Sequence, residues 1–459
     1  MEEKILELEE QIFELIEKRR FVQLKQILSE MQPADIAEIF EEAKDKEIPV
    51  LFRILPKELA AEVFVEFESD KQEILVNSFS DSELREMLDE LFMDDAADIV
   101  EEMPASVAKR ILKNTDANTR RMINQLLAYP EDSAGSIMTT EYIDLKRTMT
   151  VDEALDRIRK IGFETETIYT CYVIGSRRKL FGTISLRDLL LNSKDAIVGD
   201  LMDENIVSAH TQDDKEEVAT LFDRYDMLAL PVVDSEGRLV GIVTVDDAID
   251  VIQEEASEDI EKMAAILPSE KTYLKTGVFE TFKSRIPWLL LLMISATFTG
   301  AIISSFENKL AECIALVAFI PMLMGTGGNA GSQTSVSVIR ALSLGDIEFK
   351  DILKVIWKEM RVATIVGIVL GAINFVKLYL VDHLWLQTFD TKVISSMLTI
   401  CLTLVLVIIV AKLLGAVLPI VAKKCGLDPA VMASPLVTTI LDAVSLLIYF
   451  GIAAVLVLG

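Results

Sequence analysis

Cysteine and histidine are scarce in this chain of 459 residues, and each scarcity argues against a class of site. The four cysteines, at positions 171, 313, 401 and 425, form no CxxC pair, so neither a disulfide framework nor a zinc site is expected. Only two histidines occur, with no nucleophile–base motif and no phosphate-binding loop, so we do not expect an enzyme. The first residues lack a basic stretch followed by an apolar one, so no cleavable signal peptide is predicted.

Basic residues are also few, 45 against 73 acidic ones, yet 51% of the residues are hydrophobic. Both facts hold because the chain has two unlike halves. Residues 1–280 contain 63 acidic and 32 basic residues, a net charge of −31, whereas residues 281–459 carry a net charge of +3. An acidic half of this kind repels phosphate and attracts cations, so nucleic acid is a poor partner and cations are favoured.

Long apolar runs are confined to the second half. A membrane-spanning helix needs about 20 mostly apolar residues, and we predict five such helices. Lysine and arginine gather before the first run, between the second and third, and between the fourth and fifth. By the positive-inside rule the amino-terminal half is cytosolic and the carboxyl end lies outside a plasma (inner) membrane. The five runs are 286–306, 313–339, 362–380, 393–420 and 429–459.

The cytosolic half is predicted to contain two kinds of domain. Residues 1–132 read as an all-α acidic domain of stacked helical hairpins, because Pro or Asp with acidic neighbours recurs as a helix start at Pro33, Pro56, Asp81 and Asp94. Residues 133–252 contain a duplication: Ile137-Met138 recurs as Leu201-Met202 at an offset of 64, and Gly182-Thr183-Ile184 recurs as Gly241-Ile242-Val243 at an offset of 59.

This duplication, in segments 137–200 and 201–252, resembles a tandem pair of CBS domains, which are α/β regulatory modules. The string G-x-x-[ST]-x-x-D at Gly182–Asp188 fits the one that such modules use to hold a nucleotide ribose, so Arg187 and Asp188 are candidate ATP-binding residues. Asp188 equally fits a helix-capping role, and both readings stay open. Residues 253–282 are acidic and amphipathic, and we expect a long connecting helix that leads into the membrane domain, residues 283–459.

Two polar motifs lie inside the apolar runs. Residues 325–335 contain four glycines in seven positions together with Asn329, which a purely helix-packing stripe of small residues does not explain. The loose match to a dinucleotide fingerprint is rejected, because no strand precedes it. In the last run Ser434, Thr438, Asp442 and Ser445 are spaced to share one helix face, and Pro435 is expected to free a carbonyl for a cavity. A carboxylate at this depth costs about 2.5 to 3.5 kcal/mol, so a cation site is favoured over a packing aspartate.

The domain order and these two motifs, Gly325–Gln333 and Asp428–Asp442, resemble the MgtE family of magnesium channels over essentially the full chain. The resemblance implies a homodimer whose pore is lined by the second and fifth helices, with Asp442 as the central Mg²⁺ ligand. Hard oxygen ligands suit a hydrated Mg²⁺ ion, and Mn²⁺ and Co²⁺ are also admissible. We therefore expect a Mg²⁺-selective channel for Mg²⁺ uptake, in contact with the lipid bilayer.

Gating is expected to use the acidic half. Cytosolic Mg²⁺ would bridge carboxylates and close the pore, since an ion shifts the population toward the state that it binds better. For any single carboxylate, a solvated surface position is the alternative. The candidate metal ligands, several of them implied by the resemblance, are Asn329, Thr438 and Asp442 in the pore, Asp94 and Asp98 in the helical domain, Asp226, Asp247 and Asp250 in the second CBS unit, and Glu258, Asp259 and Asp428 around the connecting helix.

Two rival functions belong to other classes. The chain fits a secondary transporter that uses Asp442 as a proton or sodium relay, in which case transport needs a co-ion. It also fits a membrane-anchored sensor without transport, in which case replacing Asp442 leaves Mg²⁺ uptake unchanged.

Overall fold

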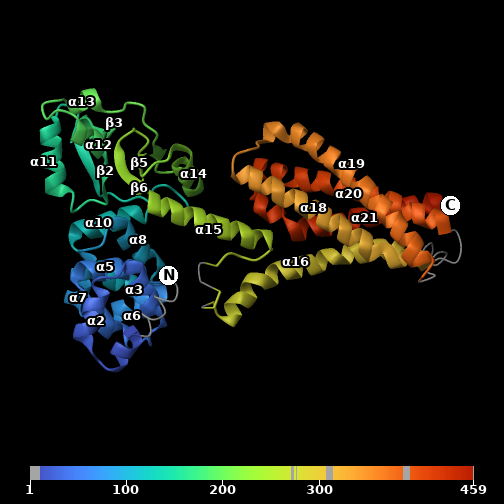
Figure 1. Ribbon diagram of the computed structural model, residues 1–459, viewed down its shortest axis with the longest axis horizontal. Helices are drawn as coiled ribbons and strands as arrows, with labels where there is room; N and C mark the ends of the chain where they lie inside the picture. Colours follow the sequence, from blue (N-terminus) through green and yellow to red (C-terminus); the bar gives the residue numbers. More distant parts are fainter. Residues whose placement is uncertain (1–10, 270–272, 275, 307–313, 386–392, 458–459) are drawn as a thin grey trace. The chain divides into compact units, whose positions relative to one another are not determined.

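The computed structural model describes residues 11–269, 273–274, 276–306, 314–385 and 393–457. The chain divides into two compact units, residues 1–253 and 254–459, which are described separately below (Figure 1).

The first unit begins with short helices, and each of them packs against the helix two places further along the chain. α3 contacts α5, α5 contacts α7 and α7 contacts α9, while α4, α6, α8 and α10 form a second row in the same way. Between the rows lie fully buried side chains such as Phe40, Phe64 and Ile111. The helices are α2 (Phe21–Leu28), α3 (Pro33–Glu42), α4 (Ile48–Phe52), α5 (Lys57–Val65), α6 (Ser69–Ser78), α7 (Asp81–Leu88), α8 (Met93–Glu102), α9 (Ala105–Asn114) and α10 (Ala117–Leu126). The stacked helical architecture predicted for this segment is therefore observed.

The recurring start signals coincide with helix starts. Pro33 opens α3, Pro56 is the N-cap of α5, and Asp81 opens α7 behind a capping box made by Ser80 and Glu83. These residues satisfy or remove amide donors that have no partner in the first turn of a helix. Local sequence therefore determines where the rows of helices turn.

Two three-stranded sheets follow, and they share one topology. In the first, β1 (Tyr142–Lys146) pairs parallel with β2 (Thr167–Ile174), which pairs antiparallel with β3 (Leu180–Ser185). In the second, β4 (Ala209–His210), β5 (Ala229–Val233) and β6 (Leu239–Thr244) repeat this order. The helices around them are α11 (Val151–Ile161), η1 (Ser176–Arg178), α12 (Leu186–Leu191), α13 (Val198–Leu201) and α14 (Lys215–Tyr225). The expected α/β duplication is present.

Each repeat covers one edge of the other repeat's sheet. Thr139, which precedes β1, bridges Ile242 in β6, and Asp203, which precedes β4, bridges Thr183 in β3. Thr139 and Asp203 are 64 positions apart, and Thr183 and Ile242 are 59 apart, the two offsets seen in the sequence. β3 and β6 are edge strands, so each lead-in segment covers an edge of the opposite repeat.

The connecting helix differs from the expectation. α15 begins at Val245, directly after β6, and ends at Met263, whereas a helix was expected over residues 253–282. Ala265 adopts a left-handed conformation, and the next helix, α16, starts only at Val278. Pro268 prevents a continuous helix here, because its ring would clash with the carbonyl group of Ala264, four residues earlier, and it provides no amide donor. The CBS repeats are thus not joined to the membrane domain by one continuous helix.

The second unit contains the apolar helices. Within the described residues, four segments are long and apolar enough to cross a membrane: 278–305, 349–383, 393–424 and 429–456. The remaining expected span, α18, is a helix of 24 residues whose Gly, Ser, Thr and Asn content lowers its hydropathy. The elements are α16 (Val278–Ser305), η2 (Ile314–Phe319), α18 (Ile320–Ser343), η3 (Phe349–Asp351), α19 (Ile352–Lys377), η4 (Leu378–His383), α20 (Val393–Lys424), η5 (Pro429–Met432) and α21 (Ser434–Leu456).

α18 and α20 form the centre of this unit. α18 packs on both α20 and α21, α19 packs on α20, and α16 packs on α21 (Figure 1). The backbones of α18 and α20 approach closely at Gly331 and Gly415, where a Cβ atom added to Gly415 would lie 2.3 Å from the Gly331 carbonyl oxygen. The least apolar helix is therefore held in place by more apolar neighbours.

Candidate functional site

The glycine-rich motif of residues 325–335 lies in the middle of α18 as regular helix. In the described part of the chain η2, and not a strand, directly precedes α18, which agrees with the rejection of a dinucleotide-binding loop. An added Cβ at Gly325 would meet no atom within 4 Å, whereas at Gly328 it would lie 3.1 Å from Thr438 Cγ2. The motif thus leaves open space on one side and allows close approach of α21 on the other.

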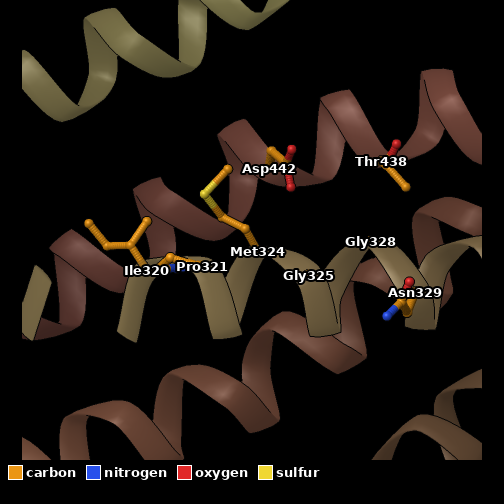
Figure 2. Close-up of a pocket in the computed structure, with 8 residues that line it drawn as sticks. All are labelled: Ile320, Pro321, Met324, Gly325, Gly328, Asn329, Thr438 and Asp442. Atoms are coloured by element: carbon orange, nitrogen blue, oxygen red, sulfur yellow. The ribbon is translucent and has the colours of Figure 1, made fainter. Parts of the chain in front are cut away.

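This open space is a hollow of about 400 Å³ between α18 and α21. Figure 2 shows Asn329 on α18, with Thr438 and Asp442 one turn apart on α21. The structure therefore brings together the three pore residues that we singled out. The hollow is lined by Ile320, Pro321, Met324, Gly325, Gly328, Asn329, Thr438 and Asp442.

Asp442 supplies the negative charge of the hollow. It is half-buried, and among the residues that the structure describes it makes no hydrogen bond or ion pair. The Thr438 hydroxyl donates to the Pro435 carbonyl oxygen at 2.9 Å, so its lone pairs remain available as acceptors. These features disfavour a packing aspartate tied to a neighbouring helix and leave carboxylate, hydroxyl and amide oxygens around one space.

Two details differ from the sequence interpretation. Pro435 lies in the first turn of α21 rather than inside the helix, so it causes no break there. Ser445 was expected on the face of Asp442, but it is buried, and a Cβ added to Gly327 would lie 2.9 Å from its hydroxyl. Ser445 therefore contributes to helix packing and does not line the hollow.

The last turns of α15 contact α18 and the residue that precedes η5, the short helix before α21. Lys262 Nζ lies 2.6 Å from Glu258 Oε1 and 2.7 Å from Asp428 Oδ2, and the Ser343 hydroxyl of α18 donates to Asp259 at 3.4 Å. Asp428 Oδ1 also accepts from the Ala430 amide at 2.7 Å, which caps η5 just before α21. The three carboxylates predicted around the connecting helix are thus grouped, with a lysine between two of them.

The pKa values of this group reflect its crowding. Burial, together with the charge of Asp428, raises the pKa of Asp259. Burial lowers the pKa of Lys262, but the ion pairs with Asp428 and Glu258 outweigh it, so the pKa of this lysine is raised. The carboxylates here therefore stabilise a cation.

A second group of carboxylates lies in the first unit, where α8 meets the start of α15. Asp94 is 7% exposed, and its Oδ1 has no hydrogen-bond partner among the described residues. Glu141 accepts from the Met93 amide at 2.9 Å, which fixes this glutamate against α8. We call Asp94, Asp95, Glu141, Glu166 and Asp247 the carboxylate cluster.

Burial and mutual repulsion raise the pKa values of the carboxylate cluster. Burial, then the charge of Asp247, raises the pKa of Asp94 well above its usual range and that of Asp95 to about 7. Burial and the charges of Asp95 and Asp247 raise the pKa of Glu166 to about 8. For Asp247, burial raises the pKa to about 6 although the Thr244 hydroxyl opposes the shift. Such groups favour either a proton or a metal ion beside them.

The other predicted cytosolic ligands lie at the rim of the carboxylate cluster or outside it. Asp98 on α8 and Asp250 on α15 have exposed side chains, but neighbouring groups screen their carboxyl groups partly from water. This desolvation and the charge of Asp247 raise the pKa of Asp98 to about 8, and desolvation and the charge of Asp246 raise the pKa of Asp250. Asp226 is exposed at the carboxyl end of α14, in a left-handed conformation. Within the described residues no group of three or more His, Cys, Asp or Glu side chains is arranged to hold a metal ion. The carboxylate cluster is therefore a region of negative charge, not a preformed cage of ligands.

The two CBS repeats differ at equivalent aspartates. Asp188 is exposed with Arg187 in the first turn of α12, and its carboxylate accepts from the Ser185 hydroxyl at 2.6 Å. The residue that caps the helix is Ser185, whose hydroxyl oxygen accepts from the Asp188 amide, so Asp188 supports the cap and is not the cap itself. Asp247 is held in the same way by Thr244 but belongs to the carboxylate cluster. Only the first repeat thus presents this carboxylate to solvent, where a ribose could reach it.

Comparison with known proteins covers most of the chain. Residues 320–452 match the family described as "Divalent cation transporter", residues 31–132 match the MgtE intracellular N domain, and residues 134–195 and 198–254 match CBS domains. The transporter match confirms the expectation that the chain is not an enzyme.

Similar full-length and solved proteins agree. The magnesium transporter MgtE of Thermus thermophilus is 37% identical over 94% of this chain and 95% of its own length, and that of Bacillus subtilis is 35% identical over 94% and 93%. The ATP-bound cytosolic domain of the Mg²⁺ channel MgtE is similar over 52% of this chain and 98% of its own, with 38% identity and a TM-score of 0.50. The soluble part of a magnesium transporter is similar over 55% and 99%, with 31% identity and a TM-score of 0.52. The expected resemblance is confirmed: the chain belongs to the MgtE family.

Proposed function

We propose that the chain is a Mg²⁺-selective channel for Mg²⁺ uptake, and that hydrated Mg²⁺ passes beside Asp442. The observation that carries this proposal is the Asp442 carboxylate, which has no partner among the described residues and faces a hollow that Asn329 and Thr438 also line. Mg²⁺ holds its water molecules in an octahedral shell and releases them reluctantly. Six waters occupy roughly 180 Å³ at about 30 Å³ each, which is less than the hollow of about 400 Å³. An ion can therefore be held through its waters.

A second copy of the chain completes the pore in this proposal. One protomer offers a single carboxylate, and two Asp442 side chains near one axis would repel each other when empty and favour a divalent ion between them. The first CBS repeat also exposes apolar side chains that a partner subunit could cover, since Phe163 is 97% exposed and Leu191 is 74% exposed. Homodimer formation would remove such surface from water.

Cytosolic Mg²⁺ closes the channel by binding among the carboxylates. Without a divalent ion, the carboxylate cluster and its rim residues Asp98 and Asp250 repel one another, and with the ion they approach. α15 carries Asp247 and Asp250 near its start and Glu258 and Asp259 near its end, so one helix runs through both carboxylate groups. Ion binding at the first group would therefore bias the contact that α15 makes with η5 and α18.

The remaining expectations complete the proposal. The cytosolic side carries the acidic unit, and the carboxyl end lies outside the plasma membrane, in keeping with the loop lysines and arginines. ATP binds at the exposed Arg187 and Asp188 of the first repeat. The carboxylate, hydroxyl and amide oxygens of Asp442, Thr438 and Asn329 favour Mg²⁺ and admit Mn²⁺ or Co²⁺.

Flux through the purified protein in liposomes tests conduction. We expect Mg²⁺ influx with the unmodified chain, near-complete loss with Asp442→Asn, and no change with Asp346→Asn, which alters an exposed loop carboxylate. Influx that requires a proton or sodium gradient would indicate a secondary transporter and contradict a channel. Influx absent from the unmodified chain, or unaffected by Asp442→Asn, would overturn the proposal and favour a sensor.

A titration of Mg²⁺ on the cytosolic face tests gating. Millimolar Mg²⁺ should suppress the current, and Asp247→Asn should relieve the suppression while Asp223→Asn, an exposed residue of α14, should not. Currents indifferent to cytosolic Mg²⁺ would remove the gating part and leave conduction standing.

A further inference from the structure

A buried ammonium group in the membrane domain has no part in the conduction or gating proposed above. Lys412 lies in the middle of α20 and is only 6% exposed. A lysine at the centre of a membrane helix costs about 2.5 to 3.5 kcal/mol on insertion scales. A charge of this kind is expected to have a partner and a role.

The partner is reached through a hydroxyl group on another helix. Lys412 Nζ donates to Thr334 Oγ1 of α18 at 3.1 Å, and Thr334 Oγ1 donates to Glu359 Oε2 of α19 at 3.2 Å. The directions agree, because a hydroxyl accepts one hydrogen bond while it donates another. Three helices are thus joined by a chain that has a positive charge at one end and a carboxylate at the other.

The same turn of α18 is tied to the other wall of the hollow. The hydroxyl of Ser335 donates to the Met432 carbonyl oxygen at 2.8 Å, in η5 just before α21. Gly331 and Gly415, which make the close backbone contact, lie three positions before Thr334 and three after Lys412. On a helix such neighbours share a face. The charged chain therefore sits beside the tightest contact of α18 with α20.

Asn329 lies five positions before Thr334 on α18, about 7.5 Å along the axis at 1.5 Å per residue. A helix held on one face by Thr334 and on another by Ser335 has little freedom to rotate. Its rotation determines how far the Asn329 amide stands from Asp442 across the hollow.

We propose that Lys412 and Glu359 are positioning residues, a charge-balanced pair bridged by Thr334 that sets the rotation of α18 and so the place of Asn329 opposite Asp442. Balance is essential to the proposal. An unpaired Lys412 adds a positive charge to a domain that carries cations, and an unpaired Glu359 leaves a half-buried carboxylate without its partner. Loss of both charges restores neutrality, so the effects of the two single changes should not add.

The test compares Lys412→Met, Glu359→Gln and the double variant, with Lys358→Met as control because Lys358 is an exposed neighbour on α19. The first readout is Mg²⁺ influx, which rests on the proposed function. We expect each single variant to raise the half-saturating Mg²⁺ concentration by about threefold or more, and the double variant to return to within about twofold of the parent. A role limited to folding would lower thermal stability and leave half-saturation unchanged.

The second readout does not depend on transport. Asn329→Cys is introduced into each variant, and the rate at which a water-soluble thiol reagent modifies it is measured. We expect a change of about threefold or more in the single variants, recovery in the double variant and no change with Lys358→Met. Additive effects, or modification rates equal in all variants, would overturn the proposal. Recovery of the modification rate in a protein that shows no Mg²⁺ influx would support it while removing the proposed function.

Discussion

Lys262 Nζ lies 2.7 Å from Asp428 Oδ2, and this ion pair joins the last turns of α15 to the turn that opens α21. The lysine occupies, among Glu258, Asp259 and Asp428, the kind of position that a metal ion would otherwise take. The contact therefore has a cation of its own, and part of its strength does not depend on the divalent concentration.

Replacing this lysine should loosen the contact when no divalent ion is present. With Lys262→Met, the carboxylates repel one another in a divalent-free cytosolic buffer, and we expect basal Mg²⁺ influx to rise by about fivefold, the lower end of typical coupling between sites. Lys354→Met, which changes an exposed lysine of α19, serves as the control. Basal influx equal to that of the parent would show that the pair does not restrain the pore.

The raised pKa values of the carboxylate cluster predict a dependence of stability on pH. Asp95, Glu166 and Asp247 have pKa values of about 7, 8 and 6, above the 3.8 to 4.5 of free side chains. A raised carboxyl pKa means that the folded state holds its proton more tightly, so stability falls as the pH rises from about 4 to about 8. Thermal unfolding of the full chain in EDTA should follow this fall.

Mg²⁺ should offset that loss, since it replaces the protons. We expect the stabilisation by millimolar Mg²⁺ to grow from pH 5 to pH 8 and to shrink in Asp95→Asn, whereas Asp223→Asn should behave as the parent. An equal effect of Mg²⁺ at both pH values would contradict ion binding among these carboxylates.

The close backbone contact between α18 and α20 predicts the effect of a single methyl group. Gly415→Ala would place a Cβ atom against the Gly331 carbonyl oxygen, which only movement of a backbone can relieve. Overpacking of this kind costs about 1 to 3 kcal/mol, and unfolding in detergent should occur at a lower temperature. Gly451→Ala, where an added Cβ meets no atom within 4 Å, should be neutral or slightly stabilising.

The difference between the two CBS repeats predicts where a nucleotide binds. Asp188→Ala should weaken ATP binding to the full chain by about tenfold, the loss expected for a hydrogen bond to a charged group. Calorimetric titration measures this, with Asp195→Ala, an exposed neighbour, as the control. Equal affinities in all three proteins would limit Asp188 to its hydrogen bond with Ser185, the cap of α12.

Local signals in the sequence were sufficient for much of this structure. The helix starts at Pro33 and Asp81 depend on neighbouring residues, and the two repeat offsets follow from the internal duplication. Each of these features was predicted at the correct position. The face shared by Thr438 and Asp442 follows from helical periodicity alone. Such features need no knowledge of tertiary packing.

Features that depend on tertiary contacts were missed. Asp95, Glu141 and Glu166 come together from distant segments, and no spacing in the sequence relates them. Lys412 lies inside the predicted span 393–420 but was assigned no role, because its partner is a hydroxyl group on another helix. The break after Met263 had a signal, Pro268, which the acidic periodicity of the segment obscured.

The exchange of lead-in segments between the CBS repeats has a consequence for dissection of the chain. Thr139 and Asp203 each pair with the sheet of the other repeat. Cleavage between residues 195 and 200, followed by separation of the two repeats, would therefore leave one sheet edge uncovered in each repeat. The duplicated halves are interdependent, and a fragment carrying either one alone would expose an open edge prone to self-association.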